Sequence, residues 1–224
     1  MTIDAAPALL PVPSLAIAPL YPGGFFPPAG LPAAAALLLT GDLDGAEAAY
    51  RERLEDEPHR AAIGLAAVVG VLGDHIRARA HIEDAGVGPS DLDQAVADAN
   101  RSAAHLGDGR LDRAERAAAA ALRAGRRTRD EGVAAIGGLA SALAHLARGR
   151  RADARTRLGE AVRGFARSGE VLRQVQCHHL LGEIAYDGED PIRAGAHYRD
   201  ALKLARQAGA TAAVELLMLR FEHR

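Results

Sequence analysis

The residues with the greatest potential for chemistry form a short stretch in which Cys177, His178 and His179 are consecutive and Glu183 follows. On a helix, His179 and Glu183 are one turn apart and share a face, so together they can hold a metal ion or relay a proton. The spacing indicates no third ligand, and two ligands do not define a metal centre. We therefore interpret this pair as polar groups in the wall of a binding groove, and we predict no metal site.

The other signals for catalysis are weaker. A cysteine beside a histidine can become an activated nucleophile, but neighbours on a helix point about 100° apart, so Cys177 is interpreted as a small core residue. It is the single cysteine, which excludes a disulfide framework and a cysteine-based zinc cluster. No glycine-rich loop has phosphate-binding spacing, and the Arg-rich stretch 110–129 lacks interleaved aromatic residues. No catalytic residue, cofactor or nucleic-acid partner is predicted.

The composition indicates closely packed helices. The chain has 224 residues, of which 49% are hydrophobic, 25% are charged and only 4% are aromatic. Alanine is abundant, and it combines the best helix propensity with a side chain small enough for close helix contacts. No apolar run approaches the roughly 20 residues that a membrane-spanning helix needs, so no membrane association is expected.

Residues 1–32 form a proline-rich and apolar N-terminal tail. They contain eight of the eleven prolines, which exclude regular helix, together with Tyr21, Phe25 and Phe26. We expect this tail to dock as an extended or polyproline-like strand, with an undocked terminus as the alternative. It lacks the basic start and uninterrupted apolar stretch of a secretory signal, so a cytoplasmic location is expected.

From residue 33 the chain contains a repeated pattern, a glycine followed five residues later by an alanine. Its copies are Gly41/Ala46, Gly73/Ala78, Gly109/Ala114 and Gly149/Ala154, and a fifth has Gly188 one place early before Ala194. The later copies are about 40 residues apart, a period typical of stacked supersecondary units. Each unit has an apolar stretch, a short turn and an amphipathic stretch, which predicts two helices per unit.

Over residues 27–208 this pattern resembles the tetratricopeptide (TPR) repeat family, in a lengthened form of about 40 residues that is similar to repeats of bacterial regulators. The first unit matches the family pattern through Ala34, Gly41, Ala46, Tyr50 and Pro58, and the last through Gly182, Ala194, Tyr198 and Ala201. The resemblance implies an all-α, right-handed solenoid of about five helical hairpins over residues 33–208. Residues 209–224 are expected to form a capping helix, with a dimerisation helix as the alternative.

In this family the first helix of each unit faces a concave groove. The resemblance then implies groove positions that are mainly apolar in the middle units and polar in the last unit. These candidate groove-binding residues are Leu106, Ile136, Leu139, Leu143, Leu146, His179, Glu183 and Tyr186. The stretches 61–73 and 134–147 are apolar on every side, so they are expected to be buried all round. We expect this apolar groove to be covered by the N-terminal tail, a partner peptide, a second copy of the chain or an apolar small molecule. The alternative is that tight curvature of the solenoid fills the groove with its own side chains.

These features favour a non-catalytic module that binds a protein or peptide through an apolar concave groove, which its own N-terminal tail is a candidate to occupy. An enzyme or small-molecule-binding protein of a bacterial biosynthetic pathway, using the same groove, is the alternative. A homo-oligomeric scaffold whose apolar faces meet across a two-fold axis is a third interpretation. Fold alone does not decide among them.

Overall fold

The computed structural model describes residues 25–28, 30–40 and 42–222. Within these ranges it contains eleven helices. Their bounds are α1 Pro32–Thr40, α2 Leu43–Arg51, α3 Pro58–Val71, α4 His75–Ala85, α5 Asp91–Gly107, α6 Leu111–Thr128, α7 Glu131–Ala147, α8 Arg151–Ser168, α9 Val171–Asp187, α10 Pro191–Gln207 and α11 Thr211–Glu222. Residues 1–24 of the predicted tail and residues 223–224 of the predicted capping helix lie outside the described residues.

The helices begin and end at residues whose chemistry suits these positions. A side chain directly before several helices accepts a hydrogen bond from a backbone N–H of the first turn, which satisfies an otherwise unpaired donor. These capping residues are Asp42, Asp74, Ser90, Asp130 and Asp190. In the short turns of the second, third and fourth units, Gly73, Gly109 and Gly149 have positive φ angles, a conformation in which a side chain would be strained. The predicted turn glycines therefore have a conformational role.

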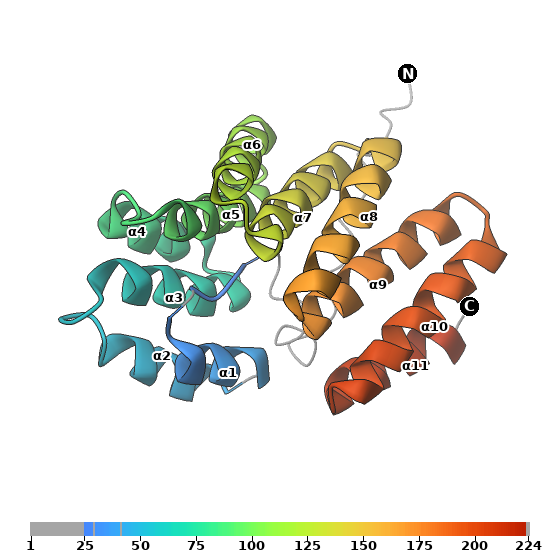
Figure 1. Cartoon of the computed structure of the whole chain (residues 1–224), viewed down its shortest axis with the longest axis horizontal. Coiled ribbons are helices and arrows are strands. Elements are labelled where there is room, and N and C mark those ends of the chain that lie inside the picture. Colours follow the sequence, from blue (N-terminus) through green and yellow to red (C-terminus); the bar gives the residue numbers. More distant parts are fainter. Residues whose placement is uncertain (1–24, 29, 41, 223–224) are drawn as a thin grey trace, which may run out of the picture.

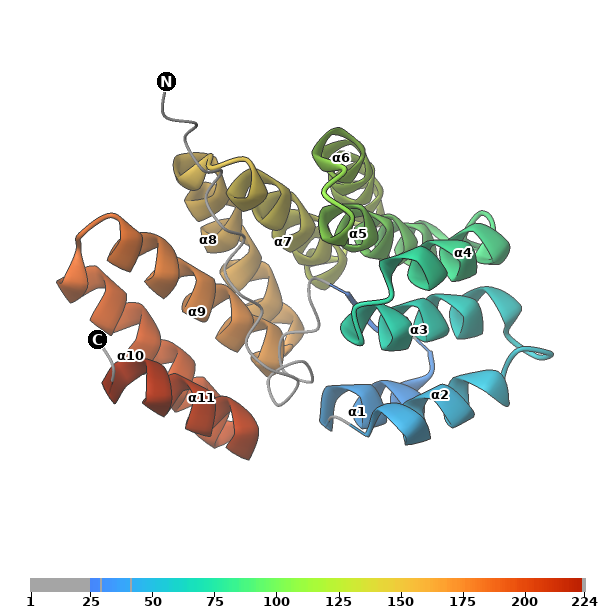
Figure 2. The same cartoon turned by 180° about the vertical axis from the view of Figure 1, so that it is seen from behind.

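Consecutive helices pack as pairs along an arc that runs from α1 to α11 (Figure 1). Each of α4, α6 and α8 packs against the helix before it and the helix after it, while α3, α5 and α7 also contact one another in series. The view from behind has the same order of pairs (Figure 2). This arrangement confirms the predicted all-α class with stacked helix pairs.

The core is continuous through most of the stack. One cluster of buried apolar side chains extends from Phe25 to Ile184, and a second joins α9, α10 and α11. The alanine that follows each turn glycine is buried in every unit, with at most 2% of its surface exposed. These alanines are Ala46, Ala78, Ala114, Ala154 and Ala194. Helix α11 packs on α10, and its Ala213 and Leu217 are buried in the second cluster.

Ion pairs connect successive helices of the stack, both within a unit (α5 to α6 and α7 to α8) and between neighbouring units (α6 to the end of α7 and α8 to α9). Four of them join residues 36 positions apart, close to the length of one unit. They are Arg127–Asp91, Arg148–Asp112, Arg151–Asp187 and Arg167–Glu131. Exposed pairs of this kind each contribute only about 0–1 kcal/mol. They nevertheless give a structural use to the arginines that are concentrated in the middle of the chain.

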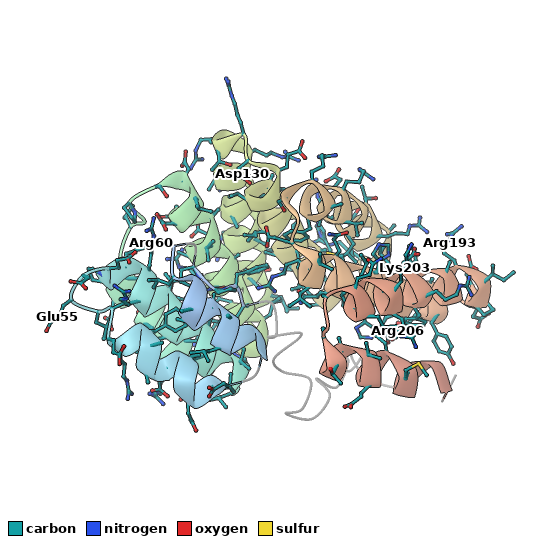
Figure 3. The ribbon with its side chains drawn as sticks, turned by 60° about the horizontal axis from the view of Figure 1, so that its bottom comes forward. Glu55, Arg60, Asp130, Arg193, Lys203 and Arg206 are labelled. Atoms are coloured by element: carbon teal, nitrogen blue, oxygen red, sulfur yellow. The ribbon has the colours of Figure 1, made fainter. Side chains whose placement is uncertain are left out.

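A better buried pair joins α3 to α5. Arg60, labelled on α3 in Figure 3, donates to both carboxylate oxygens of Asp93 at 2.9 and 3.5 Å. Burial acts to raise the pKa of Asp93, but the hydrogen bonds from Arg60 and Ser90 outweigh it, so the pKa lies below its usual value.

In the part of the chain that the structure describes, no helix combines the length and the hydropathy that a bilayer span requires.

Candidate functional site

The segment Phe25–Pro28, which precedes α1, is enclosed by helices from distant parts of the chain. The side chains of Phe25 and Phe26 are 0% and 1% exposed. Their contacts come from α3, α4, α5 and α9, so the segment spans the concave side of the arc rather than lying on one helix pair. In Figure 1 this short segment is dark blue and crosses α3.

Asn100 on α5 holds the backbone of this segment through two hydrogen bonds. The backbone N–H of Phe26 donates to Oδ1 of Asn100 at 2.6 Å, and Nδ2 of Asn100 donates to the carbonyl oxygen of Phe26 at 2.9 Å. Asn100 is 0% exposed, and its neighbours Ala99, Ala103 and Ala104 are small enough for a close approach. Both backbone polar groups of one extended residue are therefore satisfied by a single buried amide.

The ring of Phe25 occupies a slot that depends on a glycine. A Cβ atom added to Gly70 on α3 would lie 2.2 Å from Cζ of Phe25, so any side chain at position 70 would displace the ring. On another side, the ring is stacked on His75 of α4, with centroids 6.2 Å apart and planes at 4°. This slot therefore has the shape of a flat aromatic side chain.

Arg173 on α9 contacts both phenylalanines from the opposite side of the arc. Its Nη2 donates to the carbonyl oxygen of Phe25 at 3.3 Å, and its guanidinium carbon lies 4.4 Å from the centroid of the Phe26 ring. Nη1 donates to Oε1 of Gln176 at 3.1 Å. Burial lowers the pKa of Arg173 to about 10, although nearby Glu170 acts in the opposite direction. Burial disfavours the charged form of Arg173, and a guanidinium in such a position is well suited to recognising carbonyl oxygens and aromatic faces.

The sequence-predicted groove residues are distributed unevenly in the structure. Ile136 and Leu139 on α7 are buried, and Leu143 and Leu146 are partly buried against the same core cluster. Leu106 on α5 is also half-buried, whereas Tyr186 at the end of α9 is 41% exposed. The predicted all-round burial of the stretches 61–73 and 134–147 is observed for residues 61–70 and 135–142. It is wrong at the end of the first stretch, because Leu72 follows the last residue of α3 and is 52% exposed.

His179 and Glu183 lie together, as their spacing predicts, and the structure adds a third member. Nε2 of His179 lies 3.4 Å from Oε1 of Glu183, and the hydroxyl of Tyr198 on α10 donates to that same oxygen at 2.7 Å. All three side chains are buried. Nearby Cys177 is fully buried as well, and burial raises the pKa of its thiol, which keeps it protonated and a poor nucleophile at neutral pH.

Asn100 and Arg173 are site residues that were not predicted from the sequence. Asn100 is a polar amide among alanines on a helix that is otherwise apolar on that side, and this contrast is the one sequence signal that was available. Arg173 resembles many other arginines of the chain, and nothing in its local sequence indicates that it is buried.

No family model matches the chain, and a search of the curated proteins finds no match.

Proposed function

We propose that this protein is a non-catalytic interaction module that binds an extended peptide with adjacent aromatic residues on its concave side, and that its own Phe25–Phe26 segment occupies this site in cis. The observation that supports the proposal is the pair of hydrogen bonds between Asn100 and the backbone of Phe26. The fold in this proposal is a right-handed TPR-like solenoid, which the recurring buried alanines and the left-handed turn glycines favour.

The contacts separate into two kinds that suit peptide recognition. Asn100 and Arg173 pair with backbone groups, which every peptide has, and these contacts provide affinity without reading the sequence. The slot beside Gly70 and the cation–π contact of Arg173 select aromatic side chains. A ligand of the form Phe-Phe, followed by prolines that keep the chain extended, fits both kinds of contact.

The burial of charge and amide groups also favours a binding role over a purely structural one. A buried arginine and a buried asparagine are expensive unless each finds hydrogen-bond partners. Here part of that compensation comes from a segment outside the helix stack, the backbone of residues 25 and 26. Apolar side chains at these two positions of the stack would have served stability alone at least as well.

The test is peptide binding in trans by the full-length chain. In a Phe25→Ser/Phe26→Ser variant the cis segment loses its anchors, so a fluorescently labelled peptide with the sequence of residues 22–28, PGGFFPP, should bind and raise its fluorescence anisotropy. Adding Asn100→Ala to this variant should weaken binding roughly tenfold or more, because two backbone hydrogen bonds are lost. A labelled peptide with both phenylalanines replaced by serine is the control.

Failure of the PGGFFPP peptide to bind, in a variant that keeps its helical circular-dichroism spectrum, would contradict the proposed function. Equal binding of the two peptides would contradict aromatic selection. Arg123→Ala is a matched control for Asn100→Ala, because Arg123 is exposed on α6 and should leave the affinity unchanged.

A further inference from the structure

A second polar cluster joins α9 to α10 through His178, His197 and Asp200. Nδ1 of His178 lies 3.3 Å from Nδ1 of His197, and 3.8 Å from Oδ2 of Asp200. One ligand atom from each residue lies within 4.8 Å of the other two. His197 and Asp200 are three residues apart on α10, so both project towards the same side of that helix.

These distances match a tetrahedral metal site. Zinc binds imidazole nitrogen at about 2.0–2.1 Å, so two nitrogen ligands at tetrahedral angles are about 3.3 Å apart. The two imidazole nitrogens already have this separation. Asp200 is 59% exposed, so its carboxylate has room to move towards the two imidazoles and complete a metal–oxygen bond.

We infer that His178, His197 and Asp200 form a binding site for one divalent transition-metal ion, with Zn²⁺ as the best match to two nitrogen ligands and one oxygen ligand. Three protein ligands leave a fourth tetrahedral position, as in zinc sites that keep an exchangeable water. Because Asp200 is at the surface, this position faces solvent and is accessible to a water molecule or a small anionic ligand.

The scaffold holds the three ligands in a fixed relationship. His178 is on α9, and His197 and Asp200 are on α10, the second helix of the same hairpin. The two helices pack closely because Gly182 on α9 makes room for Tyr198 on α10. A Cβ at position 182 would lie 2.5 Å from Cε1 of Tyr198. Ligands on rigid, closely packed helices are positioned more accurately than ligands on loops.

The protonation states also suit metal binding. Burial lowers the pKa of both imidazoles, so both are neutral and available as ligands at neutral pH. The charge of Asp200 acts to raise the pKa of both imidazoles. Arg193, labelled on α10 in Figure 3, acts to lower the pKa of His197, as burial does. Without a metal, two neutral imidazoles at 3.3 Å share a single hydrogen bond, which uses one donor and one acceptor.

The experiment is a titration of the full-length chain, purified without a histidine tag, with ZnCl₂ in competition with a chromophoric zinc indicator. The wild-type chain should bind one equivalent with a dissociation constant in the micromolar range or tighter. His178→Ala and His197→Ala should each weaken binding by roughly tenfold or more, and Asp200→Asn should weaken it to a smaller extent. His81→Ala, which removes a half-buried histidine of α4 outside the cluster, is the matched control and should bind as the wild type does.

Cobalt gives an independent measurement that does not depend on the stability of the variants. Co²⁺ added to the wild-type chain should produce the visible absorption bands of a tetrahedral complex, and one equivalent of Zn²⁺ should remove them. Absence of zinc binding, or binding of equal affinity in His178→Ala, His197→Ala and His81→Ala, would overturn the inference. So would a cobalt spectrum that is identical to that of the aqueous ion.

Discussion

The amide side chain of Asn100 makes two hydrogen bonds with one residue, Phe26, accepting from its backbone N–H at 2.6 Å and donating to its carbonyl oxygen at 2.9 Å. The two residues are 74 positions apart in the sequence. A neighbouring strand in a sheet satisfies a peptide through N–H and C=O groups in a similar way. One side chain of a helical repeat thus does for an extended segment what an adjacent strand does in a sheet.

Replacement of Asn100 should release this segment. Asn100→Ala leaves the N–H and C=O of Phe26 unpaired, and Asn100→Asp keeps the acceptor but loses the donor. We expect Asn100→Ala to reduce the unfolding free energy by about 1–3 kcal/mol. Asn100→Asp should reduce it by at least as much, because it also buries a carboxylate against the carbonyl oxygen of Phe26. Hydrogen exchange followed by mass spectrometry should detect slow exchange of the Phe26 amide in the wild type and fast exchange in Asn100→Ala. Equal exchange in both would contradict the assigned contact.

Gly70 should be intolerant of even a methyl group. Because its added Cβ would lie 2.2 Å from Phe25, Gly70→Ala should displace the ring and reduce the unfolding free energy by about 1–3 kcal/mol. Gly138→Ala on α7 is the matched control, since there the nearest atoms lie 3.7 Å away. The control should gain about 0.5–1 kcal/mol from better helix propensity. A similar change in urea midpoint for the two variants would count against the slot.

The turn of the fifth unit has a strained backbone. Its energetic cost can be measured by introducing a glycine there and by removing the equivalent glycine from another unit. At the place where earlier units have a glycine with positive φ, this unit has Glu189 with φ of 57°, because its glycine comes one residue early. Glu189→Gly should raise stability by about 1 kcal/mol, and Gly149→Ala, at φ of 72°, should lower it by a similar amount. Thermal unfolding of the two variants checks both signs, and a destabilised Glu189→Gly would contradict the equivalence of the turns.

The fold was predictable from sequence because its determinants are local and recur. The buried alanines and the turn glycines each follow from spacing within one unit. The apolar stretches 61–73 and 134–147 are buried as predicted over residues 61–70 and 135–142, but not at their ends, where Leu72 is 52% exposed. The glycine one place early in the fifth unit was also visible, although the strain at Glu189 was not.

The candidate sites were less predictable because they depend on how units far apart approach one another. Asn100 and Arg173 both contact Phe25–Phe26 only because of the curvature of the helix stack, which no local pattern specifies. The pairing of His178 with His197 requires the register between α9 and α10. The predicted partner of His179, Glu183, is on the same helix, and for that reason spacing alone was sufficient.

Two histidines at equivalent places in successive units should make stability depend on pH. Burial, assisted by Arg79 for His105 and by Arg150 for His145, lowers the pKa of each imidazole in the folded chain. The unfolded chain then binds more protons just below the ordinary pKa of about 6.5, so the unfolding free energy decreases as the pH falls through this range. Urea unfolding between pH 7 and pH 5 should detect a smaller decrease in a His105→Gln/His145→Gln variant. Identical pH profiles would contradict the assigned burial effect.

The most direct test of a cis-occupied peptide site is the affinity of the PGGFFPP peptide for two full-length chains, the wild type and the Phe25→Ser/Phe26→Ser variant, measured by fluorescence anisotropy in the same buffer. A tethered segment competes at a high effective concentration, so we predict that the wild type binds the peptide roughly tenfold or more weakly than the variant does. Equal affinities of the two chains, or tighter binding by the wild type, would contradict the central claim that residues 25 and 26 occupy the site where a partner peptide binds.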